Sequence, residues 1–218
     1  MVQSNPSIGS DPASRSKELF LVEGESAALA VQRVCNPNFQ AVLPMQGKPL
    51  NAWKASQAKV AAYPLFQKLL EVLGTELGAG PSTAAEPIEK IIFLFDPDAD
   101  GIHCSALMLW FFYRWLPGML EAGQVHAALP PVCELISVQS SQKWHPRNHH
   151  EAEKIIAECA EQGIDDLQRK TFRGLASIGS ELLAQHCIDP ASRKLIRLRP
   201  ADAVSSLQAF GMPPKSLG

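Results

Sequence analysis

Three aspartates with alternating spacing are the residues best suited to chemistry in this sequence. Asp96, Asp98 and Asp100 directly follow an apolar run. In an extended chain, alternate side chains point to the same side, so these three carboxylates are predicted to converge. Pro97 favours an extended conformation at Asp96, and Gly101 permits the turn that must follow. The pattern predicts a cluster of negative charge at the end of a strand.

A fourth carboxylate, Glu23, ends another apolar run and is followed by Gly24. If the two runs form neighbouring parallel strands, it lies at the same edge of the sheet, where ligands of α/β proteins bind. Converging carboxylates repel one another, and a hard cation such as Mg²⁺ relieves this repulsion through oxygen ligands. We predict a site for Mg²⁺, with Mn²⁺ as a substitute, that suits phosphoryl chemistry. Its predicted ligands are Glu23, Asp96, Asp98 and Asp100.

Two other interpretations of the aspartates have to be weighed. The segment DPDADG also matches the opening of a calcium-binding EF-hand loop, but Leu107 stands where the loop needs its glutamate, and a strand precedes it instead of a helix. An isolated pattern of this kind is equally compatible with solvated residues that cap a turn. The surrounding elements therefore have to decide.

Those elements alternate between predicted strands and predicted helices. Short runs rich in branched and aromatic residues predict buried strands, and longer periodic stretches predict helices. The alternation indicates an α/β fold, with a central parallel sheet of about four strands flanked by helices. The predicted strands are 19–22, 39–43, 91–95 and 124–128, and the predicted helices are 26–34, 52–62, 65–73, 103–116 and 151–161.

Polar segments divide the chain. Residues 1–16 are predicted to be a flexible tail, residues 74–87 a flexible connection, and residues 139–150 a polar break. We expect the main domain over 17–138, a polar linker and helix over 139–168, and a C-terminal tail segment over 169–218.

Composition narrows the class of protein. The chain has 218 residues, of which 46% are hydrophobic, and a net charge of −2. This slightly negative charge argues against a protein that binds DNA through an overall excess of positive charge. Five scattered cysteines indicate neither a zinc site nor a disulfide framework. The longest apolar stretch, Ala106 to Phe112, is too short to span a bilayer, and no secretory signal is evident. We therefore expect a cytoplasmic protein without a membrane segment.

Taken with their flanks, these segments resemble the toprim domain and C-terminal tail of the B subunit of DNA gyrase and topoisomerase IV. The resemblance implies a toprim fold, Rossmann-like, with a small C-terminal appendage of helices and strands. It covers most of Glu18 to Leu135 and Lys170 to Val204. Five segments carry it in the order of the family: ELFLVEGESA, FQAVLPMQGKPLNAWKA, IIFLFDPDADGIH, FFYRWLPGMLEAGQVHAALPP and FRGLASIGSELLAQHCIDPASRKLIRLRPADA.

The resemblance also implies roles for individual residues. Glu23 corresponds to a residue that is both general acid or base and metal ligand, and the three aspartates correspond to the magnesium carboxylates. The catalytic residues that the resemblance implies are Glu23, Lys48 and Asp96. Contacts to DNA are implied for Lys48, Asn51, His103 and Arg173. For Asn51 a helix N-cap is the alternative, for His103 a structural cap, and for Lys48 and Arg173 a solvated or locally paired charge.

This sequence departs from the family pattern at several positions. Glu25 replaces an aspartate, and Ala28 and Leu29 replace paired glycines, which is expected to alter the approach of DNA. Gln46 and Ser105 stand where arginines are usual, and Ala176-Ser177 replaces a glycine and a glutamate. The stretch between Pro131 and Phe172 is shorter, so the tail is expected to be tethered more tightly to the main domain.

Three functional hypotheses follow. In the first, the chain supplies the Mg²⁺ site of a type II topoisomerase, with DNA as substrate and a gyrase A-like subunit providing the tyrosine. Neither Tyr63 nor Tyr113 is expected to be a nucleophile. No ATP site is expected in the chain, so an ATPase subunit is a further expected partner. The second hypothesis is a non-catalytic paralogue that regulates by binding DNA or a partner, and the third is an independent toprim nuclease.

Overall fold

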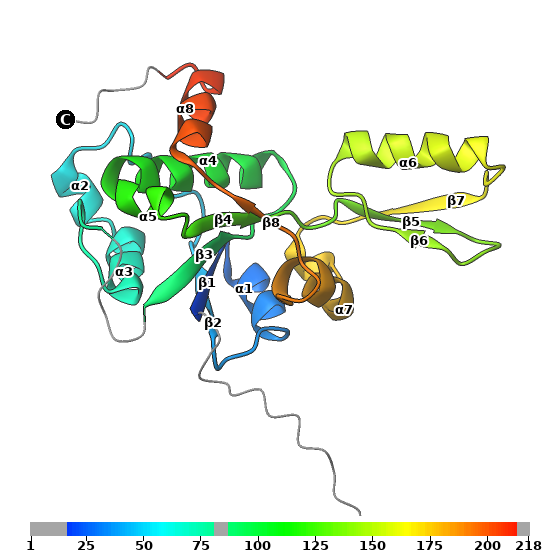
Figure 1. Ribbon diagram of the computed structural model, residues 1–218, viewed down its shortest axis with the longest axis horizontal. Coiled ribbons are helices and arrows are strands. Elements are labelled where there is room, and N and C mark those ends of the chain that lie inside the picture. Colours follow the sequence, from blue (N-terminus) through cyan, green and yellow to red (C-terminus); the bar gives the residue numbers. More distant parts are fainter. Residues whose placement is uncertain (1–16, 81–86, 213–218) are drawn as a thin grey trace, which may run out of the picture.

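The computed structural model describes residues 17–80 and 87–212, so the predicted tail 1–16 and part of the predicted connection 74–87 lie outside the described residues. Two sheets and several helices make up the fold (Figure 1). The strands are β1 (Lys17–Val22), β2 (Gln40–Pro44), β3 (Ile88–Phe93), β4 (Val125–Ala128), β5 (Cys133–Ser137), β6 (Lys143–Trp144), β7 (Leu167–Thr171) and β8 (Leu195–Arg197). The α-helices are α1 (Glu25–Gln32), α2 (Gln57–Ala61), α3 (Pro64–Leu73), α4 (Ala99–Trp115), α5 (Pro117–Glu121), α6 (His149–Glu161), α7 (Ser180–Leu183) and α8 (Pro200–Ala209). Two short non-α helices, η2 (Leu175–Ser177) and η3 (Ala184–Ile188), lie in the C-terminal part.

The larger sheet has the strand order β2-β1-β3-β4-β8. The first four strands are parallel, and β8 adds to the edge in the antiparallel direction. The predicted α/β fold with a central parallel sheet is confirmed. β2 lies on one side of β1 and β3 on the other, so the order in which strands are added reverses between β1 and β3. Ligands of parallel α/β sheets bind at such a switch point, beyond the carboxyl ends of the strands.

Both faces of this sheet are buried, as expected for parallel strands connected by helices. Leu19, Leu21, Ile91 and Phe93 pack on one face with α3, α4 and α5. Alternate residues of the same strands, such as Phe20 and Ile92, pack on the other face with α1, α7 and η3. Figure 1 shows α4 and α8 on one side of the sheet and α1 and α7 on the other. The C-terminal part therefore covers both faces of the sheet.

The second sheet, with the order β6-β5-β7, is antiparallel. It extends to one side of the larger sheet, with α6 lying along it (Figure 1). A small core of its own includes Cys133, Leu135 and Ala152. Residues 139–150, predicted as a polar break, thus contain the short strand β6 and the start of α6. The division of the chain into domains stays a prediction.

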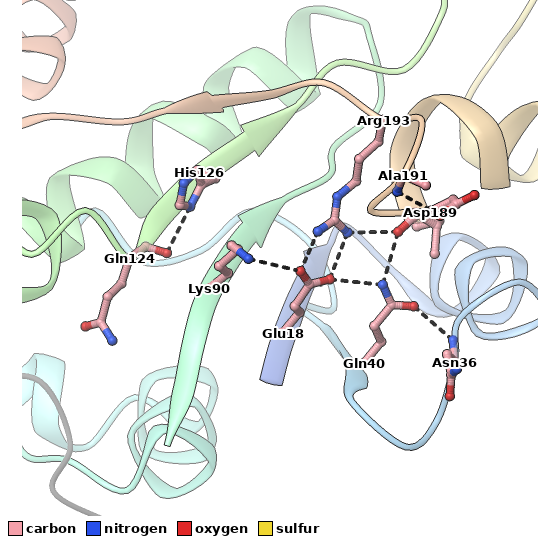
Figure 2. A network of polar contacts seen from close by, with 10 residues as sticks. Glu18, Asn36, Gln40, Lys90, Gln124, His126, Asp189, Ala191 and Arg193 are labelled. Carbon is pink, nitrogen blue, oxygen red and sulfur yellow. Dashed lines mark hydrogen bonds and ion pairs between the residues drawn. The ribbon is translucent and has the colours of Figure 1, made fainter. Parts of the chain in front are cut away.

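A buried network joins the C-terminal part to the beginning of the larger sheet (Figure 2). Arg193 Nη1 donates to Glu18 Oε2 at 2.8 Å, and Arg193 Nη2 donates to Glu18 Oε1. Gln40 Nε2 donates to the same carboxylate at 2.9 Å and to the carbonyl of Ile188 at 3.0 Å. The side chains of Glu18 and Arg193 are 2% and 3% exposed, so this is an interior ion pair. It holds residues far apart in sequence together.

Most predicted elements are present, with three corrections. The predicted helix 52–62 is wrong in its first half, because only Gln57–Ala61 is helical. Arg114 Nη1 donates to the carbonyls of Ala52, Trp53 and Ala55, so these acceptors do not serve a helix. The helix predicted from His103 begins at Ala99 instead. The predicted end of 65–73 is confirmed, since α3 stops at Leu73 and Gly74 adopts the left-handed conformation with φ 61°.

The third correction concerns the aspartates. The predicted extended run from Asp96 to Asp100 is wrong, because the last strand residue is Phe93 and Asp100 lies in the first turn of α4. Aspartate is a favoured N-cap residue, and Asp98 has this role here. The helix therefore begins at Ala99, and Asp100 is helical where the alternating pattern predicted an extended chain. Within the described ranges, no helix is both long and apolar enough to cross a membrane.

Candidate metal centre

Glu23 and Asp96 lie just beyond the ends of the adjacent strands β1 and β3. The strands are in register, with Leu21 opposite Phe93, and the amide of Leu94 donates to the carbonyl of Leu21 at 3.0 Å. Two residues further on, the amide of Asp96 donates to Glu23 Oε1 at 3.0 Å. The parallel sheet therefore brings together two carboxylates that are separated by 73 residues in sequence.

The start of α4 closes tightly over this pair. Asp98 caps the helix, its Oδ1 accepting from the amide of Gly101 at 2.9 Å. A Cβ at Gly101 would lie 2.0 Å from the carbonyl oxygen of Asp96 and 2.7 Å from Glu23 Oε1. Only glycine allows the helix to approach this closely, so Gly101 has a packing role inside α4, and the turn predicted at this residue before the helix is wrong.

A loop from the C-terminal part reaches the same carboxylates. The amide of Leu175 donates to Asp96 Oδ1 at 2.8 Å. Gly174, with φ 143°, passes so close that a Cβ there would lie 2.7 Å from Asp96 Oδ2. The hydroxyl of Ser177 accepts from the amide of Arg173 at 2.9 Å and donates to the carbonyl of Gly174 at 2.7 Å, which closes the loop. Sequence reasoning missed these backbone contacts, and the glycine within FRGLAS was the one signal for them.

The electrostatics of the pair follow from burial and like charge. Burial raises the pKa of Glu23; the amide of Asp96 opposes this, and the charges of Asp96, Asp98 and Asp100 add to the rise. Burial also raises the pKa of Asp96, against the hydrogen bond from the amide of Leu175, and the charge of Asp98 adds to the rise. The protein thus keeps two carboxylates where their ionised forms are disfavoured, and a bound cation would relieve this cost.

Asp100 faces a different partner. Lys48 Nζ lies 2.7 Å from Asp100 Oδ1, and the two side chains are 50% and 69% exposed. The hydrogen bond and charge of Lys48 lower the pKa of Asp100, and Asp100 raises the pKa of Lys48 in return. Two of the residues predicted to act at the site are therefore paired with each other.

The remaining predicted DNA contacts lie at different places around the site. The side chain of Asn51 accepts from the amide of Lys54 at 3.2 Å, so it caps a single turn, in place of the helix from Ala52 that the alternative interpretation assumed. The ring of His103 stacks on Phe210, with centroids 5.6 Å apart, next to the end of α8. Arg173 is exposed and borders a hollow of about 230 Å³ that Asp96 and Ser26 also line.

The donor set fits a hard divalent cation. All four candidate ligands are carboxylates, which are the donors that Mg²⁺ prefers. Within residues 17–80 and 87–212, no group of three His, Cys, Asp or Glu side chains is arranged to hold one ion. Mg²⁺ usually keeps several waters and uses one or two carboxylates together with phosphate oxygens. The adjacent carboxylates of Glu23 and Asp96 match that small number of protein ligands.

Sequence comparison identifies the domain that this geometry belongs to. Residues 18–129 match the family model of the Toprim domain. This match covers β1 to β4 and includes Glu23 and all three aspartates. The chain belongs to the Toprim domain family.

B subunits of DNA gyrase are among the relatives that match most of this chain. The chain is 32% identical over 214 residues to the DNA gyrase B subunit of Staphylococcus aureus, covering 97% of this chain and 33% of the relative. It is 31% identical over 193 residues to the DNA gyrase B subunit of Treponema denticola, covering 88% of this chain and 30% of the relative. The chain thus spans about a third of the length of these relatives. The resemblance inferred from the sequence is confirmed.

The structure shows where several of the departures from the family pattern lie. Ala28 and Leu29 both belong to α1, where Ala28 is buried and Leu29 is 54% exposed. Gln46 adopts a positive φ of 56° in the loop before Lys48. Ser105 lines a cavity of about 470 Å³ that also borders Asp96. Ser177 replaces a family glutamate with a hydroxyl that fixes the loop at Asp96.

Proposed function

We propose that this toprim protein supplies the Mg²⁺ site for DNA strand cleavage and religation by a type II topoisomerase-like complex. The observation that carries this proposal is the pairing of Glu23 with Asp96 at the switch point of the sheet, where the amide of Asp96 donates to Glu23 Oε1 at 3.0 Å. Their pKa values are raised chiefly by burial, with like charge adding to the rise. A site that keeps carboxylates close together despite this cost is suited to a divalent cation.

In this proposal each residue of the chain has a separate task. Glu23, Asp96 and Asp98 hold the cation, which when bound polarises a phosphate and stabilises a departing oxygen. Glu23 also acts as general acid or base near the phosphate, the role that the family resemblance implies for it. Lys48 contributes positive charge to the phosphate, and Asn51, His103 and Arg173 are the further residues proposed to contact the DNA strand.

The nucleophile belongs to another chain. Tyr113 is partly buried and packs against Trp53, with ring centroids 6.0 Å apart, and Tyr63 packs against Phe66 at 5.0 Å. Both rings serve the packing of the protein interior. We propose a gyrase A-like subunit as the source of the tyrosine and an ATPase subunit as a further partner, with the complex acting on DNA in the cytoplasm.

Metal binding is the first test. Calorimetric titration with Mg²⁺ and Mn²⁺ compares the wild-type protein with Asp98→Asn, which keeps an N-cap side chain but removes a charge, and with Glu23→Gln. Asp165→Ala, at an exposed acidic residue outside the site, is the matched control. We expect binding in the wild type and the control, and weaker or no binding in the two site variants. Equal binding in all four proteins contradicts the proposed site.

Cleavage is the second test. The protein and a tyrosine-bearing gyrase A subunit are incubated with supercoiled plasmid and Mg²⁺, and cleaved DNA is trapped with detergent. The proposal expects cleavage that needs both proteins and is lost in Glu23→Gln. Nicking by the chain alone would instead support the independent nuclease. A stable complex of the two proteins that gives no cleavage and is unaffected by the site variants would support the regulator.

A further inference from the structure

The contact between Lys48 and Asp100 has a geometry that the proposed DNA contact of Lys48 does not explain. Lys48 Nζ lies 2.7 Å from Asp100 Oδ1, while half of the lysine side chain remains exposed. An ion pair this exposed is held only weakly, because water competes for both charges. The lysine is thus able to leave Asp100 when a stronger partner for either charge arrives.

The loop that carries Lys48 is attached to Glu23 itself. The amide of Met45 donates to the carbonyl of Val22 at 2.8 Å, and the amide of Gly47 donates to the carbonyl of Glu23 at 3.1 Å. Gln46 and Gly47 turn the chain with positive φ angles of 56° and 105°. Because its backbone is fixed at the end of β1, the loop presents the Lys48 side chain beside the carboxylates.

Asp100 is also fixed from its own side. It lies in the first turn of α4, whose start is held by the Asp98 cap and by the close approach of Gly101 to Asp96. Two anchored backbones therefore face each other, and the side chains of Lys48 and Asp100 bridge the space between them. The mobile part of this contact is the lysine side chain, with its flexible four-carbon stem.

We propose that Lys48 is a built-in counter-ion of the acidic site, which competes with the divalent cation and is released to DNA phosphate when the cation binds. This inference rests on the proposed function and deepens it, because it couples metal binding to DNA binding. Without metal, the ammonium group neutralises part of the acidic cluster. With metal, the same positive charge is repelled, and a phosphate becomes its better partner.

Two consequences of opposite sign follow. Removing the charge of Lys48 removes a competitor and a repelling charge, so metal binds more tightly in the absence of DNA. The same change removes a phosphate contact, so DNA binds more weakly. Linkage is reciprocal, so DNA that draws Lys48 away from Asp100 must strengthen metal binding in the wild type. A lysine that served only as a DNA contact would not change metal affinity in the absence of DNA.

The test measures metal affinity directly. Mn²⁺ is titrated into the wild type, Lys48→Met, Lys48→Arg and Lys54→Met, and the free ion is followed by electron paramagnetic resonance. Lys54 is an exposed lysine in the turn that follows the same loop, and its replacement is the matched control. We expect Lys48→Met to bind Mn²⁺ about two- to fivefold more tightly than the wild type, as suits the loss of one exposed charge. Lys48→Arg and Lys54→Met should stay close to the wild type.

A second titration adds a short DNA duplex. We expect the duplex to tighten Mn²⁺ binding to the wild type and to do so much less in Lys48→Met. Unchanged or weaker Mn²⁺ binding in Lys48→Met without DNA overturns this inference while leaving the metal site intact. If the wild type binds no Mn²⁺, both the inference and the proposed function fail. The two failures are therefore distinguishable, because the first leaves Mn²⁺ binding by the wild type intact.

Discussion

The buried ion pair between Glu18 and Arg193 leads to the most quantitative prediction. Replacing Arg193 with methionine keeps a side chain of similar length but leaves the Glu18 carboxylate, only 2% exposed, without its main partner. Two weaker partners remain, the side-chain amide of Gln40 at 2.9 Å and the Lys90 ammonium, whose Nζ lies 3.6 Å from Glu18 Oε1. Breaking a buried pair by removing one partner costs about 3–5 kcal/mol. Because Lys90 compensates in part, we expect a loss near the lower end, about 3 kcal/mol.

The pH dependence has a definite sign. Burial alone would raise the pKa of Glu18, but the hydrogen bonds from Arg193 and Gln40 and the charges of Arg193 and Lys90 outweigh it, so its pKa is lowered. A carboxyl with a lowered pKa in the folded state stabilises the fold above the pKa of the unfolded chain. This contribution is lost as pH falls through the folded pKa. In Arg193→Met the pKa of Glu18 is expected to rise, so the cost of this substitution should shrink as pH is lowered.

Urea unfolding at pH 7, followed by circular dichroism, measures the free energy of unfolding of each variant. The double variant Glu18→Met/Arg193→Met replaces both charges and should be more stable than Arg193→Met alone, because no unpaired charge stays buried. The control is Arg33→Met, at an exposed arginine, with an expected change within about 0.5 kcal/mol. A cost below about 1 kcal/mol for Arg193→Met, or a double variant less stable than it, would refute this reasoning.

Three further predictions concern the site and its surroundings. Without metal at pH 7, Glu23→Gln should be more stable than the wild type by up to about 1 kcal/mol, because the raised pKa of Glu23 makes its ionised form a cost. Thermal unfolding in chelator should show this difference shrinking as pH falls through that pKa, and saturating Mg²⁺ should reverse the order. Ser177→Ala should cost about 1 kcal/mol and speed hydrogen exchange at the Leu175 amide, which donates to Asp96; unchanged exchange would mean that the hydroxyl does not hold the loop. Arg114→Met should cost about 2 kcal/mol in urea unfolding, because the carbonyls of Trp53 and Ala55 lose their side-chain donor while Ala52 keeps the Nε1 of Trp115; a much smaller cost would indicate that water replaces the guanidinium.

The sequence alone was sufficient for the α/β class and for the identity of the acidic residues. Runs such as 91–95 are too short and too rich in branched residues for helices, and their alternation with periodic segments leaves few arrangements other than a parallel sheet. Such a sheet places residues that follow its strands at one edge. This rule predicted that Glu23 and Asp96 lie together, and the structure has them in contact.

The sequence was less informative where side chains compete for backbone groups. Nothing local indicates that Arg114 takes the carbonyls that would have made a helix from Ala52 onward. The alternation of the aspartates fitted a strand, but the ability of Asp98 to cap a helix prevailed and placed Asp100 in the first turn of α4, where it pairs with Lys48. A spacing pattern does not decide between a strand and a capped helix, because both use extended backbone at the first residue.

Contacts across long sequence separations were decided by tertiary structure alone. The amide of Leu175 reaches Asp96, and Arg193 reaches Glu18, over separations of 79 and 175 residues. Neither contact has a local signal, because a backbone amide exists at every residue except proline and a buried arginine cannot be distinguished from an exposed one by its letter. The sequence determined which residues carry the charge of the site. Folding decided which of them lie in contact: Glu23 with Asp96, and Asp100 with Lys48.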